Sequence, residues 1–360
     1  MMDIAVYLDE KDITNYAFFA ATQHGDNLFF SDFNSNALFK LNLLSGVTEI
    51  VGFFPEHDLH WVAFNQPDSI WFLPAGAVKK RICIYKFSEQ AFTYMNLPGT
   101  DDRENRYANF IIDDSYVWII PCRDNLLLRI NRANEQLEIV TEMPQNTING
   151  KTVNFGDAII INGAIYCCPF EYENILKYNI ESSTFSEIHW QHDLMHYQKM
   201  LYFEGFIYYI PNRSGDMIVR HNVAGDQIED WFKLQIDGTS DWFCGFAQQD
   251  DTVWIMPNGG AFGAKVCLTN KTIERICFID KSHSTQPVHV NSYIPITLSD
   301  GGVLFPPTDV RNPIVYIDAY QNINLLHMKG NPRNFLCVLK QHIDCIGKSG
   351  SRKSKILYEC

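Results

Sequence analysis

Two segments of the chain join histidine and aspartate in nearly the same order. HDLHW spans residues 57 to 61 and HDLMHY spans residues 192 to 197, so His57 and His60 lie in the first segment and His192 and His196 in the second. An imidazole titrates close to neutral pH, so these side chains could act as general bases, bind a ligand or coordinate a divalent metal ion. The alternative is that they only cap a repeated structural element. Their role therefore depends on where the fold places them.

The chain lacks the compact motifs that identify many enzyme classes. It contains no HExxH, GxSxG or CxxC pattern, so a zinc protease, a serine hydrolase of the common type and a zinc ribbon are not indicated. NGGAFGAK, at residues 258 to 265, is rich in glycine but joins two expected strands and is not expected to bind phosphate. We expect no cofactor, with a divalent metal ion held within one histidine segment as the alternative.

Composition and charge narrow the class of protein. A chain of 360 residues with 46% hydrophobic and 20% charged residues can bury a large core. The formal net charge of -13 disfavours nucleic acid and anionic membranes as partners, because both attract basic surfaces. The longest apolar runs are shorter than the ~20 residues of a membrane helix, and residues 1 to 13 lack the features of a signal peptide. We therefore expect a cytoplasmic protein.

The ten cysteines do not suggest a disulfide framework. Cys83, Cys167, Cys168, Cys267 and Cys277 lie within apolar, strand-like runs, where cysteine serves as a small hydrophobic residue. We expect reduced thiols.

One pattern recurs seven times along the chain: an aromatic or β-branched run, usually a proline, a short polar loop and a second apolar run. SIWFLPAGAVKKRICIYKF and YVWIIPCRDNLLLRINR are two copies. The proline recurs every 42 to 49 residues, at Pro74, Pro121, Pro169, Pro211, Pro257 and Pro306. This period, in strand-rich units, is typical of β-propeller blades.

Each unit has a further strand-like stretch before and after the two runs, which makes four strands. Asn162-Gly163, Glu204-Gly205 and Asp300-Gly301 favour tight hairpins between the first two strands, since these residues tolerate a positive φ. The prediction is an all-β fold, a seven-bladed β-propeller of four-stranded antiparallel blades. It spans residues 1 to 329, with blades from about residue 16, and a C-terminal extension follows at 330 to 360.

The unit SYVWIIPCRDNLLLRINRANEQLEIVTEMP resembles the repeats of seven-bladed propellers of the NHL, YVTN and virginiamycin B lyase type. This resemblance holds at the level of single blades and covers most of the chain, so it implies a fold more than a function. In the lyase branch it would imply a magnesium-assisted elimination supported by His and Glu, with an acidic residue soon after a WF run. This chain has WFLPAG, WIIPCR and WIMPNG at that place.

In a propeller, the connection that leads into the innermost strand of each blade opens on one face of the central channel. Both histidine segments lie in such connections, ahead of WVAF and YQKMLY, so His60 and His196 are the candidate catalytic residues. Blades two and five face each other, and metal bonds of ~2.1 Å are hard to reach from opposite walls. The ligand contacts expected around the same mouth are His57, Arg106, Tyr107, Arg123, His192, Tyr197, Arg213, Asp241, Trp242 and His289.

Arginine matches a carboxylate or phosphate with a planar fork, so the expected ligand is a small anionic molecule or a peptide carboxylate. The leading hypothesis is a propeller that binds such a ligand, or a protein or peptide partner, at the channel mouth. The alternative is a lyase, epimerase or hydrolase that uses a histidine as general base at the same place.

Overall fold

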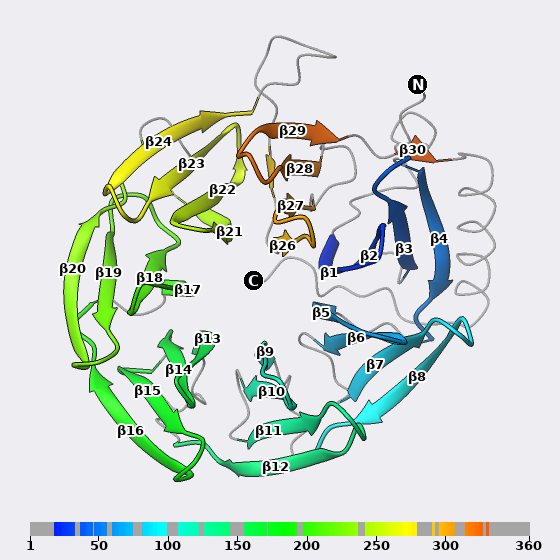
Figure 1. Cartoon of the computed structure of the whole chain (residues 1–360), viewed down its shortest axis with the longest axis horizontal. Coiled ribbons are helices and arrows are strands. Elements are labelled where there is room, and N and C mark those ends of the chain that lie inside the picture. The colour runs from blue at the N-terminus through cyan, green and yellow to red at the C-terminus, as the bar shows by residue number, and fades with distance from the viewer. Residues whose placement is uncertain are drawn as a thin grey trace, which may run out of the picture.

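The computed structural model of the chain shows seven antiparallel sheets arranged in a ring around a central axis, where the channel is expected (Figure 1). It describes residues 18–32, 37–45, 47–55, 60–74, 81–98, 107–121, 126–144, 155–170, 172–192, 197–236, 242–278, 290–291, 295–306, 314–326 and 329–330. The predicted all-β, seven-bladed propeller of four-stranded blades is confirmed. Within these ranges no helix is long and apolar enough to cross a membrane.

In every blade the strands run in sequence order from the channel to the outside, as Figure 1 shows. Blades 1 and 2 consist of β1 (Phe18–His24), β2 (Asn27–Asp32), β3 (Ala37–Asn42), β4 (Val47–Phe53), β5 (His60–Gln66), β6 (Ser69–Pro74), β7 (Arg81–Lys86) and β8 (Ala91–Asn96). Blades 3 and 4 consist of β9 (Tyr107–Ile112), β10 (Tyr116–Pro121), β11 (Leu126–Asn131), β12 (Leu137–Glu142), β13 (Phe155–Ile161), β14 (Ala164–Pro169), β15 (Asn174–Asn179) and β16 (Thr184–His189).

Blades 5 and 6 consist of β17 (Tyr197–Phe203), β18 (Phe206–Pro211), β19 (Met217–Asn222), β20 (Gln227–Lys233), β21 (Phe243–Gln249), β22 (Thr252–Gly260), β23 (Phe262–Cys267) and β24 (Thr272–Cys277). Blade 7 has shorter strands, β26 (Ile296–Thr297), β27 (Val303–Phe305), β28 (Ile314–Ile317) and β29 (Ile323–Leu326). Two additional short strands, β25 (Val290–Asn291) and β30 (Lys329–Gly330), pair with β22 and β4 respectively.

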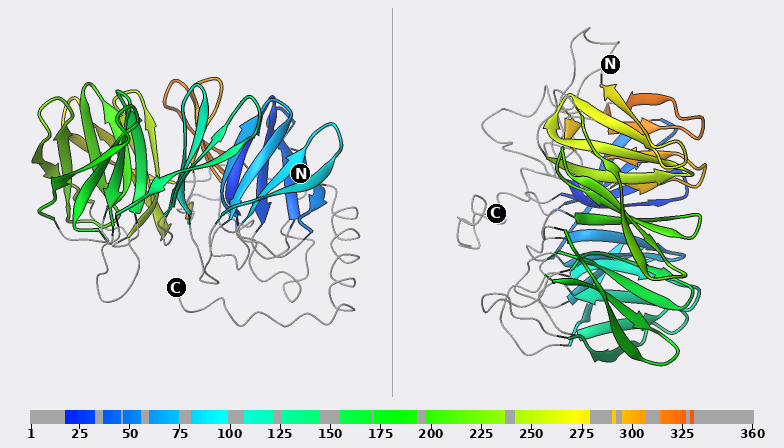
Figure 2. Two further views of the ribbon diagram at one scale, coloured as in Figure 1. Left: turned by 90° about the horizontal axis from the view of Figure 1, so that it is seen from below. Right: turned by 90° about the vertical axis from the view of Figure 1, so that its left-hand side faces the viewer.

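The hairpins that join the first to the second strand, and the third to the fourth, all lie on one side of the ring, which we call the hairpin face (Figure 2). Asn162 and Gly163 have φ of 49° and 73°, and Glu204 and Gly205 have φ of 47° and 85°. These values match the mirror-image turns that the right-handed twist of a hairpin favours. The predicted tight turns at Asn162-Gly163 and Glu204-Gly205 are therefore confirmed. At Asp300-Gly301 only Gly301 has a positive φ, of 82°, and the Leu298 N–H donates to the Gly302 carbonyl around a longer turn. The opposite side, which carries the connections between blades, is called the loop face.

The recurring prolines end the second strand of most blades, as expected of a residue that cannot donate to the ladder. Pro74, Pro121, Pro169 and Pro211 are the last residues of their strands. Pro257 differs, because β22 continues to Gly260 and pairs there with β25.

The tryptophan of the repeated run is a core residue. Trp71, Trp118 and Trp254 are at most 1% exposed. The indole N–H of Trp118 donates to Asp113 Oδ2 at 2.7 Å, and that of Trp254 donates to Gln249 Oε1 at 3.1 Å. A buried indole N–H usually has such an acceptor, because leaving it unpaired costs free energy.

Seven apolar clusters fill the spaces between neighbouring blades, one for each pair, and the last of them closes the ring. That cluster joins Ala21 and Phe30 of blade 1 to Ile296 and Leu304 of blade 7. The Ser299 N–H also donates to Gln23 Oε1 at 3.0 Å across the same seam.

β30 contributes to the same closure. Lys329 and Gly330 run parallel to Val47 and Thr48 and form a fifth strand on blade 1. The boundary predicted between propeller and extension thus falls within a strand that pairs with the first blade.

Candidate functional site

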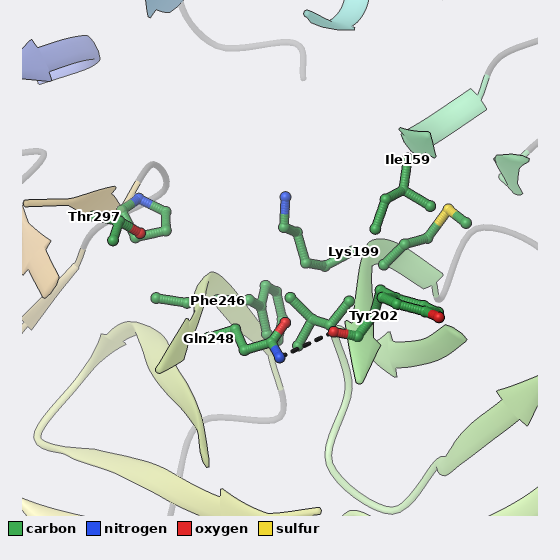
Figure 3. A pocket seen from close by; sticks show the side chains of 10 residues that line it. Ile159, Lys199, Tyr202, Phe246, Gln248 and Thr297 are labelled. Atoms are coloured by element: carbon green, nitrogen blue, oxygen red, sulfur yellow. Dashed lines mark hydrogen bonds between the residues drawn. The ribbon is translucent and has the colours of Figure 1, made fainter. Parts of the chain in front are cut away.

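A cavity of about 330 Å³ opens between the innermost strands of blades 4 to 7 (Figure 3). Its walls combine apolar side chains with a few polar ones. They come from β13, β17 and β21 and from the start of blade 7: Ile159, Lys199, Met200, Leu201, Tyr202, Phe246, Ala247, Gln248, Pro295 and Thr297. Concave spaces that combine apolar side chains with a few convergent polar groups are the usual form of a small-molecule site, although this cavity has a larger polar share than most.

The innermost strands that form these walls share an irregularity close to the loop face. The register with the second strand shifts between Phe155 and Ala158 in blade 4, between Tyr197 and Lys199 in blade 5, and between Phe243 and Gly245 in blade 6. A β-bulge turns side chains away from the regular alternation of a strand. Asp157 lies within the first of these shifts, and Lys199 resumes the ladder after the second.

Lys199 is the one charged residue among the described residues that line the cavity. Its ammonium lies 2.9 Å from Oδ2 of Asp157 on the neighbouring blade, and Figure 3 shows the side chain extending into the cavity that it lines. The side chain of Asp157 is 5% exposed and that of Lys199 is 34% exposed. The same Asp157 oxygen accepts the Met200 N–H at 3.0 Å. A buried carboxylate, fixed by main chain, therefore holds a cation at the cavity wall.

Gln248 of β21 also lines the cavity and is held in place beside β17 (Figure 3). Its side-chain N–H₂ donates to the Tyr202 carbonyl at 3.1 Å and to the Asp250 carbonyl at 2.9 Å. The amide oxygen Oε1 is not used by either bond. It can accept a hydrogen bond from a ligand, while Lys199 supplies positive charge.

Two cysteines lie in β14 behind the wall that carries Asp157. Burial raises the pKa of the Cys167 and Cys168 thiols, and the negative charge of Asp157 adds to the effect. Cys168 Sγ donates to the Tyr197 carbonyl at 3.3 Å. Both side chains remain thiols at neutral pH and act as core residues. This agrees with the expectation of reduced cysteines in strands.

His192 lies away from the channel mouth where it was expected. Its Nε2 is 3.3 Å from Oδ1 of Asp230, which belongs to β20, the outermost strand of blade 5. The ring also packs edge-on against Trp190, with centroids 5.0 Å apart. The physical reason is that each connection starts at an outer strand and ends at an inner one, so its first residues remain near the rim.

Tyr197 opens β17, as the position of its segment predicted, but its side chain is only 3% exposed. Its hydroxyl donates to the Met217 carbonyl at 2.8 Å. The ring belongs to the apolar cluster between blades 4 and 5 rather than to the surface of the channel mouth.

Two predicted ligand contacts, Arg213 and Trp242, are brought together on the loop face. They form an isolated antiparallel bridge between the loop of blade 5 and the residue that precedes β21. The guanidinium carbon of Arg213 lies 5.8 Å from the centroid of the Trp242 ring. A cation at this distance from an indole is weakly attracted to the ring.

The other predicted residues are described in part or not at all. His60 and Tyr107 are the first residues of β5 and β9, as predicted, and pair with Pro74 and Pro121. His57, Arg106, Arg123, His196, Asp241 and His289 lie outside the described residues. Among the residues that are described, no group of three or more His, Cys, Asp or Glu side chains could hold a metal ion.

Lys199, Asp157 and Gln248 were not predicted. The available signal was a charged residue inside an apolar innermost strand, in FGDAIII and YQKMLYF. Charged residues are rarely buried unless they are paired. This pattern indicated that each charged side chain has an oppositely charged neighbour, although it did not indicate which blade would supply that neighbour.

Comparisons with known proteins support the fold. No family model and no curated protein matches the chain. A streptogramin B lyase structure is similar with a TM-score of 0.64 and 14% sequence identity, over 87% of this chain and 95% of that chain. The computationally designed protein Ika8 is similar with a TM-score of 0.53 and 9% identity, over 87% of each chain.

A third similar structure is the extracellular domain of a putative one-component system from B. thetaiotaomicron. Its TM-score is 0.59 and its identity 11%, over 84% of this chain and 38% of that chain. At these identities the similarities show likeness of fold alone, while the seven blades are shown by the seven sheets of this chain. A shared fold does not establish a shared function.

Proposed function

We propose that this protein is a ligand-binding propeller that holds a small anionic molecule in the channel cavity between blades 4 and 7. The observation that carries the proposal is the ammonium of Lys199, which a buried Asp157 holds at the cavity wall at 2.9 Å. A carboxylate or phosphate of the ligand contacts this ammonium from the cavity side. Its apolar part packs on Ile159 and Phe246.

The size and polarity of the cavity support a small ligand. A volume of about 330 Å³ lies at the lower end of the range of ligand sites. Lys199 offers three donors on a flexible stem, and Asp157 occupies one side of the ammonium, so donors remain for an anion. Gln248 adds an acceptor, which favours an anion that also carries a hydroxyl or N–H group.

The test is a thermal-shift screen followed by calorimetry of the best ligand. The panel contains small carboxylates, sugar acids and phosphate monoesters, each beside a neutral amide or alcohol of the same shape. The anions should raise the melting temperature and the neutral analogues should not. Lys199→Met should weaken binding about 10-fold to 100-fold, the equivalent of ~1.5–3 kcal/mol for a hydrogen bond to a charged group.

Lys265→Met is the matched control. Lys265 lies on β23, where its ammonium is 5.5 Å from the centroid of Trp254, and it does not line the cavity. This variant should bind like the wild type. The proposal is contradicted if no anion stabilises the protein, or if both lysine variants bind equally well.

A further inference from the structure

Trp242 is an exposed aromatic side chain on a main chain that two neighbouring blades hold in place. The Phe243 N–H donates to the Asn212 carbonyl at 2.7 Å, and the Asn258 N–H donates to the Trp242 carbonyl at 3.1 Å. The bridge to Arg213 adds a further constraint. Despite these bonds, 45% of the Trp242 residue surface is exposed, whereas Trp71, Trp118 and Trp254 are buried. The fold thus presents this indole to the outside.

Among the described residues Arg213 has no acidic partner, unlike Arg129 and Arg220. Arg129 pairs with Glu138 and Arg220 with Glu229, each directly across two adjacent strands. Within the described part of the chain, no carboxylate pairs with Arg213, which is exposed beside the Trp242 ring. Its guanidinium is available to a carboxylate from outside.

Asn212, which precedes Arg213 in the chain, has a buried side-chain acceptor without a described donor. Asn212 is 4% exposed, and its Oδ1 is buried with no donor among the described residues. Buried acceptors without a donor are uncommon in folded proteins. The loop that carries Arg213 therefore contains a buried acceptor that no described residue satisfies.

We propose that Arg213 and Trp242 form a docking anchor for a peptide segment of a protein partner, one that carries a carboxylate next to an apolar side chain. The carboxylate pairs with the guanidinium and the apolar side chain covers the indole. Tryptophan and arginine are the residues most enriched at the energetic centres of protein interfaces. An exposed ring is also less suited to a free metabolite, which binds in a concave site.

The net charge of the protein also limits how much negative charge the partner segment can carry. A protein with a formal net charge of -13 repels a run of acidic residues, although salt screens this repulsion beyond ~8 Å under physiological conditions. A single carboxylate, either an Asp or Glu side chain or the carboxyl terminus of the segment, meets the Arg213 guanidinium without this cost.

This anchor is distinct from the channel cavity. Trp242 precedes β21, and the nearest cavity residue of that strand is Phe246. Four residues of extended strand span roughly 13 Å. A substitution in the anchor should therefore leave anion binding in the cavity unchanged, and a substitution in the cavity should leave peptide binding at the anchor unchanged.

The test uses the full chain and peptide selection. A library of random heptapeptides is selected against the wild-type protein, with the Arg213→Gln, Trp242→Ala double variant present as competitor. Selected peptides are resynthesised with a free or an amidated carboxyl terminus. Their affinities are measured by fluorescence anisotropy, and the comparison of termini distinguishes a terminal from a side-chain carboxylate.

The selected peptides should share a carboxylate next to an aromatic or aliphatic residue. Arg213→Gln and Trp242→Ala should each weaken binding about 10-fold to 100-fold and leave the melting temperature within a few degrees of the wild type. Arg132→Gln, on the hairpin face, and Lys199→Met, in the cavity, should bind the peptides normally. The proposal is overturned if no peptide is enriched, or if the enriched peptides bind the two anchor variants as tightly as the wild type.

Discussion

The contact between Asp157 and Lys199 should be measurable as a coupling energy between neighbouring blades. The change is a double-mutant cycle of Asp157→Asn and Lys199→Met. Asparagine keeps an oxygen that can accept the Met200 N–H, so the cycle isolates the charge contact of 2.9 Å. The free energies of unfolding of the variants are compared by urea unfolding, which is monitored by tryptophan fluorescence.

The magnitude follows from the exposure of the two side chains. Fully exposed ion pairs contribute about 0.2–1 kcal/mol, and breaking a fully buried pair costs about 3–5 kcal/mol. Here the carboxylate is 5% exposed and the ammonium 34% exposed, so solvent still screens one partner. We expect a coupling of about 1–2 kcal/mol, between the two limits.

Asp157→Ala should cost more than Asp157→Asn. It also removes the acceptor of the Met200 N–H, and an orphaned buried donor costs about 1–3 kcal/mol. A coupling below about 0.3 kcal/mol would mean that the ion pair contributes nothing measurable. Equal costs for the two Asp157 variants would mean that the bond to Met200 has no energetic weight. Either result would refute the account of how Lys199 is positioned.

Two other predictions concern packing and pH. Gly263→Ala should destabilise the protein by about 1–3 kcal/mol, because the added Cβ would lie 2.5 Å from the Ile255 carbonyl oxygen. Gly225→Ala, whose Cβ would meet nothing closer than 3.7 Å, should change the urea midpoint little, and equal shifts would contradict this packing. Burial lowers the pKa of His221, so the unfolded chain binds this proton more strongly and stability should fall as the pH drops below ~6.5. His221→Gln should flatten that part of the stability profile, measured by urea unfolding from about pH 7.5 to 5, and an unchanged slope would assign it to other groups.

The fold was predictable because its repeated features have local causes. Proline ends a strand wherever it occurs, and Asn162-Gly163 supplies the positive φ of a tight turn without help from distant residues. The pattern that contains these prolines and turn residues recurs in seven units along the chain, which predicted seven blades. The pairing of β30 with β4 was not predictable, since it depends on contacts between opposite ends of the chain.

The site was only partly predictable, because its geometry depends on pairs of blades. Arg213 and Trp242 were both expected on the loop face, and the structure adds that they form a bridge. The position of His192 was not foreseen, since the sequence does not show how far along a connection the chain reaches the channel. Asp157 and Lys199 were missed because register shifts in the innermost strands decide where their side chains point.

The most direct test of the proposed function is a crystal structure of the protein with the anion that raises its melting temperature most. The account predicts that the ligand lies in the cavity between blades 4 and 7, with an anionic oxygen about 2.7–2.9 Å from the Lys199 ammonium, the usual distance for a charged hydrogen bond. Its apolar part should contact Phe246. A ligand bound elsewhere on the propeller, or in the cavity without contact to Lys199, would contradict the proposal.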